Sequence, residues 1–215
     1  HSRLYLAGTS AATWNSGATT PLHAHSGSND IAVLALSTAG AYAWHTFYGS
    51  NRSDEGLGVT LIPDGNGSIV LCGRAEVGWD GPAGQSPVHA HSTARDLFAL
   101  RLSDAGAYSW HTFFGSTKIE SAAALVYHAV SGLNLTGYGE AIWPDYPDEA
   151  HQSGPNILRL KLNASSGAYV SHKFYGDQVG DSVADLAVDP SDGSVILVGS
   201  SFATWSGAGA AAPKH

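Results

Sequence analysis

An internal repeat constrains the fold of this chain more than any other feature of its sequence. A short aromatic run, WHTFYG in its first copy, closes on a glycine, and its three copies end at Gly49, Gly115 and Gly176. The third copy, SHKFYG, is weaker. The three glycines are 66 and 61 residues apart, so each copy belongs to a unit of about that length.

Two further motifs keep the same order and spacing. Four apolar runs each close on a glycine that precedes a tryptophan by six residues, at Gly8, Gly73, Gly137 and Gly199. An acidic or amide residue opens another apolar run in the copies Asp30–Leu36, Asp96–Leu102 and Asn156–Leu162. Several motifs that recur in one order at one period indicate a repeat architecture.

Each unit reads as four short strands separated by turn residues. In the second unit we expect strands at about 57–62, 68–73, 96–102 and 109–114. Tight Asp/Asn/Gly turns, such as Asp64–Gly67, separate the first two strands. Four antiparallel strands per repeat is the pattern of a propeller blade. We therefore predict an all-β, propeller-like array of four-stranded antiparallel blades, with about three and a half repeats; a row of β-sandwich domains fits less well.

The repeats divide the chain into one array without separate domains. We place a partial blade at 1–42, repeats at 43–108 and 109–169, and a second partial blade at 170–215. Residues 1–25 and 193–215 are copies of the same segment. Three blades do not close a ring, because propellers have about four to eight. We expect a piece of a longer chain, copies that associate through open blade edges, or an open filament.

The final repeat carries a family resemblance. Residues 181–189 (DSVADLAVD) lead through a turn into residues 193–199 (GSVILVG), and this order resembles the bacterial β-propeller repeats called SBBP repeats. The resemblance follows the order of motifs along the whole chain, although Glu120, His128 and Asn156 depart from the family pattern. It implies an extracellular or cell-surface propeller used for adhesion, scaffolding or binding, and it implies no catalytic residues.

Composition restricts the classes of partner. The net charge is −8 and only four residues are lysine, so no basic patch is expected for a nucleic acid. No apolar run approaches the roughly 18 residues of a membrane-spanning helix, and we expect no membrane insertion. The single cysteine, Cys72, lies in an apolar run and is expected in the core.

Paired histidines occupy the same loop in two repeats. The pairs are His23 with His25 and His89 with His91. Side chains two residues apart on an extended segment point to the same side, and such pairs can chelate zinc or copper. The alternative is that they are ordinary loop histidines, because no further ligands are evident. Apart from this divalent metal, no cofactor is expected.

The loop tryptophans are candidates for ligand binding. They recur at one position of the repeat, as Trp14, Trp79, Trp143 and Trp205. An indole beside an acidic or amide residue is a common sugar-binding pair, whereas recurrence at a structural position favours a role in covering the gap between blades. Histidines of the aromatic strand, His45, His111 and His172, are expected to pack or to form a hydrogen bond. Trp44 and Trp110 lie inside a predicted strand and are expected in the core or in the packing between blades.

No catalytic constellation is evident, and we expect the chain not to be an enzyme. Catalysis needs one asymmetric arrangement of groups, whereas the candidate residues recur from repeat to repeat. The acidic residues Asp54, Glu55, Asp145, Asp148 and Glu149 read as solvated or weakly calcium-binding loop residues.

Four Asn-X-Ser/Thr sequons predict glycosylation, at Asn51, Asn66, Asn134 and Asn163. Three of them fall in predicted turns, and Asn134 falls in a predicted strand, where a glycan fits poorly. Together these features predict a non-enzymatic extracellular structural protein, a building block of a surface assembly or filament. Its partners would be further blades or other copies. The alternative is a lectin-like adhesion module that binds glycans.

Overall fold

The computed structural model describes residues 3–146, 151 and 153–204, in which every regular element is a β-strand. The first sheet contains β1 (Arg3–Ser10), β2 (Asp30–Ser37) and β3 (Tyr42–Tyr48) in that order. The second contains β4 (Asp54–Leu61), β5 (Ile69–Ala75), β6 (Asp96–Leu102) and β7 (Tyr108–Phe114). The third contains β8 (Glu120–His128), β9 (Gly132–Gly139), β10 (Asn156–Leu162) and β11 (Tyr169–Tyr175). The fourth contains β12 (Asp181–Val188) and β13 (Val195–Ser201).

All neighbouring strands within these sheets are antiparallel. The all-β prediction is confirmed, and the second and third sheets have the predicted four strands. The propeller-like arrangement of the sheets stays a prediction. The boundaries that we placed at residues 43 and 109 fall inside β3 and β7, since the complete sheets begin at Asp54 and Glu120.

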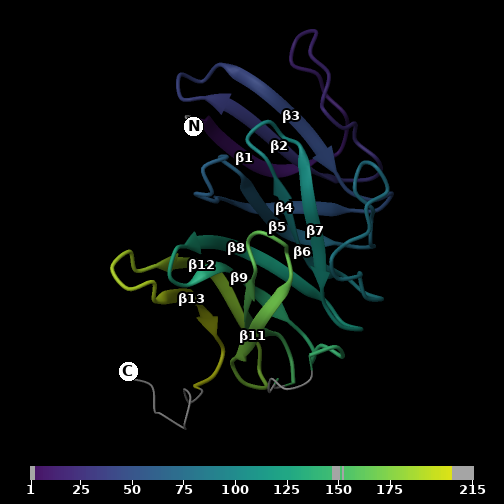
Figure 1. The fold of residues 1–215 in the computed structure, drawn as a ribbon. Coiled ribbons are helices and arrows are strands. Elements are labelled where there is room, and N and C mark those ends of the chain that lie inside the picture. Colours follow the sequence, from purple (N-terminus) through teal and green to yellow (C-terminus); the bar gives the residue numbers. More distant parts are fainter. Residues whose placement is uncertain (1–2, 147–150, 152, 205–215) are drawn as a thin grey trace.

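Consecutive sheets pack on one another in chain order (Figure 1). β4 lies against β1 on one side and β8 on the other, and β12 in turn lies against β8 and β9. Neighbouring residues of one strand therefore enter different cores. Ile69 and Leu71 belong to the cluster shared with the first sheet, whereas Val70 and Cys72 belong to the cluster shared with the third. The prediction that Cys72 is a core residue is confirmed.

Trp44 and Trp110 connect successive sheets, as predicted. The Trp44 Nε1 donates a hydrogen bond to the carbonyl of Asp104, in the β6–β7 turn of the next sheet, at 2.8 Å. Gly106 of that turn has a φ of +79° and leaves room for the Trp44 ring, which a Cβ at Gly106 would meet at 3.1 Å. Trp110 lies against Gly167 of the third sheet in the same manner. Glycine at these turns therefore serves both the backbone conformation and the packing between sheets.

We predict that alanine at Gly106 destabilises the protein more than alanine at Gly40. Both glycines occupy the same turn of their sheets with φ near +80°, but a Cβ at Gly40 would meet nothing within 4 Å. Gly40→Ala should cost about 1–2 kcal/mol for the left-handed conformation alone. Gly106→Ala should cost about 1–3 kcal/mol more, because its Cβ crowds the Leu22 side chain and the Trp44 ring. Urea unfolding of both variants measures the difference, and equal costs would contradict the packing role.

Candidate functional site

Each described loop tryptophan stacks on the histidine of the last strand of its own sheet. The rings of Trp79 and His111 lie 4.1 Å apart at 10°. Trp14 and His45 lie 4.0 Å apart at 10°, and Trp143 and His172 lie 4.5 Å apart at 22°. A phenylalanine two residues after each histidine meets both rings edge-on.

Hydrogen bonds fix the ring orientation of His111. The Nε2 of His111 lies 2.7 Å from the carbonyl oxygen of Trp79, which can only accept, so Nε2 carries the hydrogen. Its Nδ1 then accepts from the Tyr108 hydroxyl at 2.8 Å. Burial lowers the pKa of His111, and it lowers the pKa of His172 to about 4. The predicted packing and hydrogen-bonding role of the strand histidines is confirmed, with equivalent tyrosine contacts at His45 and His172.

The loop tryptophans differ in exposure because they differ in neighbours. Trp79 is 8% exposed and packs near Tyr48 of the preceding sheet, and Trp143 is 1% exposed and packs on Phe114. Trp14 is 37% exposed, and no sheet precedes its own among the described residues. This burial fits the role of covering gaps between sheets. Sugar binding by these residues stays a prediction, and Trp205 lies outside the described residues.

The second histidine of each loop pair anchors the end of a strand. The Nε2 atoms of His25 and His91 lie 3.0 and 3.2 Å from the carbonyl oxygens of Ser10 and Ala75, the last residues of β1 and β5. His151 holds the end of β9 in the same way. A recurring backbone contact gives these histidines a structural role in three sheets.

The first histidine of each pair makes other contacts. The Nδ1 of His89 lies 2.7 Å from the Phe113 carbonyl, and its Nε2 lies 3.0 Å from the Asp145 carboxylate. His23 lies beside Tyr48, and burial lowers its pKa. Within the part of the chain that the structure describes, no group of three or more histidine, cysteine or acidic side chains is arranged to hold a metal ion. The divalent metal stays a prediction.

Buried acidic residues mark the junctions between sheets, and one of them corrects a prediction. Asp54, expected to be a solvated or weakly calcium-binding loop residue, begins β4 and is fully buried. The amide and hydroxyl of Ser50, four residues earlier, donate to its Oδ2 at 2.6 and 2.7 Å. The same serine-to-acid spacing recurs at Asp30, Asp96 and Glu120. This spacing, repeated four times, is the signal that sequence reasoning missed.

Each junction joins the start of one sheet to the preceding sheet. The amide of Asp54 donates to the carbonyl of Asn29, just before β2, at 2.8 Å. The backbone amides of Glu120 and Asp181 donate in the same way to the carbonyls of Arg95 and Pro155, also at 2.8 Å. The buried side chains lie in pairs around one glycine each, Asp30 with Asp54, Asp96 with Glu120, and Asn156 with Asp181.

A glycine separates the members of each pair. A Cβ at Gly49 would lie 2.8 Å from Asp30 Oδ1 and 3.0 Å from Asp54 Oδ2, and a Cβ at Gly115 or Gly176 would overlap the neighbouring aspartate. The glycine that ends the aromatic run therefore recurs because a larger residue would collide with the carboxyl groups. Burial, with a smaller contribution from the neighbouring aspartate, raises the pKa of Glu120 to about 7 and that of Asp54 to about 6.

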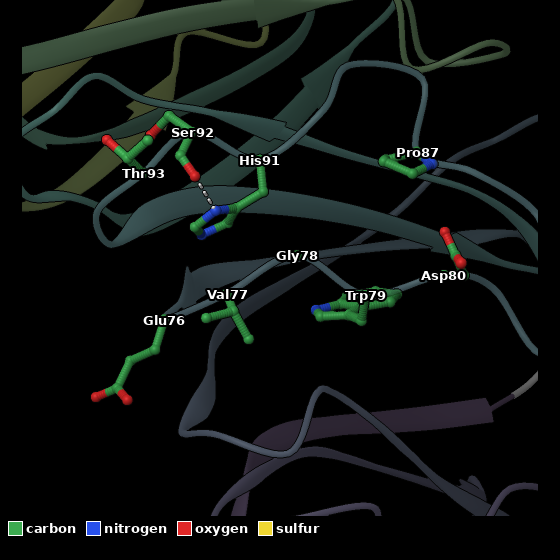
Figure 2. Close-up of a pocket in the computed structure, with 9 residues that line it drawn as sticks. All are labelled: Glu76, Val77, Gly78, Trp79, Asp80, Pro87, His91, Ser92 and Thr93. Carbon is green, nitrogen blue, oxygen red and sulfur yellow. Dashed lines mark hydrogen bonds between the residues drawn. The ribbon is translucent and has the colours of Figure 1, made fainter.

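A groove of about 420 Å³ lies beside Trp79 in the second sheet. It runs between residues 76–80 and the facing loop that carries Pro87 and His91 (Figure 2). The carboxylates of Glu76 and Asp80 lie at opposite ends of its lining (Figure 2). An indole with acidic neighbours is the pairing that suggested sugar binding, and Asp80 is exposed.

The sequons differ in accessibility. Asn51, Asn66 and Asn163 are exposed and lie in connections between strands. Asn134 is fully buried in β9, its Nδ2 donates to the carbonyls of Ser131 and Gly132, and its Oδ1 accepts from Arg159. A glycan at Asn134 would have to break these bonds. Use of the sequons stays a prediction.

We predict that stability falls between pH 6.5 and 8 because of the junction acids. A carboxyl with a raised pKa in the folded state holds its proton there and has lost it when unfolded, so stability falls as pH rises through the folded pKa. Glu120, with a pKa near 7, should contribute a loss of about 1 kcal/mol over this range. The pKa values of His111 and His172 are lowered in the folded state, so these residues affect stability only below pH 6.5. There the unfolded chain binds more protons, and the protein loses stability as the pH falls.

Asp96→Asn tests this assignment, since Asn156 occupies the equivalent place in the third junction. Removal of the neighbouring charge should bring the pKa of Glu120 down and reduce the loss, and Glu120→Gln should remove it. Chemical unfolding at pH 6.5 and 8 measures both. A wild-type protein equally stable at the two pH values would contradict the prediction.

Within the described residues, no helix is long and apolar enough to cross a membrane. Comparison of the chain with models of known protein families and with curated proteins found no match.

Proposed function

We propose that this chain is a non-enzymatic structural repeat protein whose sheets stack, propeller-like, into a larger assembly outside the cell. The observation that carries the proposal is the apolar surface at both ends of the described array. Each end displays side chains that are buried at the equivalent positions of the inner sheets.

The first end is the outer face of β1. Leu4 and Leu6 are 49% and 51% exposed there. Their equivalents in the second sheet, Ile69 and Leu71, are fully buried against the first sheet. Trp14 borders the same face, in a hollow of about 220 Å³.

The other end is the outer face of β13. Ile196 and Val198 are each 57% exposed, whereas the equivalent Val70 and Cys72 are fully buried against the third sheet. The two ends thus correspond to the two sides of one inner interface. Such complementary, non-identical surfaces associate head to tail and extend an array.

Three observations support the remaining parts of the proposal. The buried histidines and carboxyl groups recur from sheet to sheet. They form hydrogen bonds with backbone groups of this chain, as structural residues do. The resemblance to SBBP repeats implies a location at the cell surface. Exposed sequons at Asn51, Asn66 and Asn163 suit a glycoprotein of this kind.

We predict that the chain associates in a concentration-dependent manner and that a charge on one end weakens the association. Leu6→Lys and Ile196→Lys each place an unpaired charge in the apolar contact and should weaken it at least tenfold, about 1.4 kcal/mol. Val88→Lys is the matched control, because Val88 is 49% exposed but lies in a loop of the second sheet. Sedimentation velocity measures the association. A wild-type chain that stays monomeric, or a Leu6→Lys chain that assembles like wild type, would contradict the proposal.

The groove beside Trp79 supports a second candidate function, carbohydrate binding in adhesion. A sugar seated there would contact the indole edge and the Asp80 carboxylate (Figure 2). We expect a bound glycan to change tryptophan fluorescence and Asp80→Ala to weaken its binding at least tenfold. Asp192→Ala, in the exposed β12–β13 turn, is the control. A glycan panel without any fluorescence response would count against this function.

A further inference from the structure

The outer edge of β1 has no partner strand among the described residues. The strands at the equivalent position, β5, β9 and β13, each pair on that side with the first strand of their sheet, β4, β8 or β12. All three pairs carry a register shift at the same place, after Gly56, Ala122 and Val183. Among the described residues, the sheet that contains β1 therefore lacks one strand, and the other three sheets show the type, register and bulge position of that strand.

The glycine at position 8 also indicates that a strand could pair with β1. At the equivalent glycines a Cβ would overlap a backbone carbonyl of the first strand: Glu55 for Gly73, Ser121 for Gly137 and Ser182 for Gly199. Glycine is required there because the paired strand comes too close for any side chain. A Cβ at Gly8 would meet nothing within 4 Å. Gly8 thus keeps the residue that a paired first strand demands, although no strand among the described residues pairs with β1 on that side.

β12 is a strand of the required type, and its present partner resembles β1. Residues 4–10 (LYLAGTS) and 195–201 (VILVGSS) are identical at three of seven positions and share the order of four apolar residues, a glycine and two small hydroxyl residues. β13 rests mainly on β12 and has no comparable contact with the third sheet. Every residue of β13 is at least partly exposed, whereas β5 is almost wholly buried. β13 is therefore the most weakly held strand partner in the described fold.

We propose that β12 of one copy pairs with the free edge of β1 in a second copy and takes the place that β13 occupies within one chain. The register follows from the present pair, in which Asp181, Val183 and Leu186 face Ser201, Gly199 and Leu197. In the exchanged pair the same three residues face Ser10, Gly8 and Leu6. This inference rests on the proposed end-to-end assembly and specifies how the ends join.

The exchange keeps the hydrogen bonds of the β12 ladder and adds contacts. One antiparallel partner replaces another with the same order of apolar residues and glycine, so the exchange costs few ladder bonds. β1 brings β2 and β3 with it, which completes a four-stranded sheet next to the third sheet of the first copy. It also covers an open strand edge, which otherwise invites unspecific pairing. Face-to-face stacking without exchange would leave that edge open.

Two glycine variants test the exchange. Gly8→Ala places its Cβ in open space within one chain, so its thermal unfolding should match that of the wild type. In the exchanged pair the same Cβ meets the Ser182 carbonyl, and association should weaken at least tenfold. Gly199→Ala displaces β13 from β12 instead, and association should stay equal or strengthen. Assembly of Gly8→Ala at the wild-type concentration would overturn the exchange.

Cysteine pairs test the register independently of these variants. The Ser182 and Ser200 hydroxyl oxygens lie 2.9 Å apart, so side chains at this pair meet. Thr9→Cys with Ser182→Cys should form disulfides between chains under oxidation and yield cross-linked oligomers. Ser182→Cys with Ser200→Cys locks β12 to β13 within one chain and should keep the protein monomeric until it is reduced. The native Cys72 is fully buried and stays in place.

The outcomes separate the exchange from the proposed function. A locked variant that assembles like the wild type overturns the exchange and leaves end-to-end stacking intact, which Leu6→Lys then probes. A wild-type chain that stays monomeric at all concentrations overturns both. Assembly of the wild type, loss of assembly in the locked and Gly8→Ala variants, and a disulfide between residues 9 and 182 of different chains support the exchange.

Discussion

The junction between consecutive sheets is the contact on which the rest of the structure depends. A backbone hydrogen bond from the first residue of a sheet, such as Asp54, reaches the residue before the second or third strand of the preceding sheet. A serine-bound carboxyl group next to an obligatory glycine fixes the chain at the same point. Because each sheet is placed by this junction, the apolar cores between sheets and the burial of Trp79 and Trp143 by the preceding sheet follow from it. Because these carboxyl groups are kept from water, the junction is sensitive to their protonation.

The repeat predicted the strands because its motifs alternate apolar and turn residues at a fixed period. β6 was predicted at its observed bounds, and β4 began three residues earlier than expected. The reason is Asp54: an acidic residue beside a turn normally is solvated, and only its serine partner and the adjacent sheet bury it. The exposure of the loop tryptophans was equally beyond local prediction. Trp14 and Trp79 share a motif and a histidine stack, and the presence of a preceding sheet decides which one is covered.

The third repeat shows which parts of the unit can vary. Asn156 replaces an aspartate at the junction, and its Nδ2 donates to the Asp177 carbonyl, so the pair carries one carboxyl group in place of two. His172 keeps its tyrosine and tryptophan neighbours, while its Nε2 has no hydrogen-bond partner. The glycine, the ring stack and the backbone bond persist through these changes. These three features are common to the repeats, whereas the number of carboxyl groups at the junction differs between them.

The division of each inner strand between two cores has a mechanical consequence. Leu71 and Cys72 are adjacent in sequence but pack toward opposite neighbours, so a sheet detached from the array exposes both of its faces at once. Tension applied along such a chain loads the junctions in series, and the weakest one yields first while the others keep their packing. Each sheet that unfolds would lengthen the chain by one period of 61 to 66 residues, which is on the order of 200 Å when extended. An array built in this way dissipates a pull in steps and refolds from whichever neighbours remain.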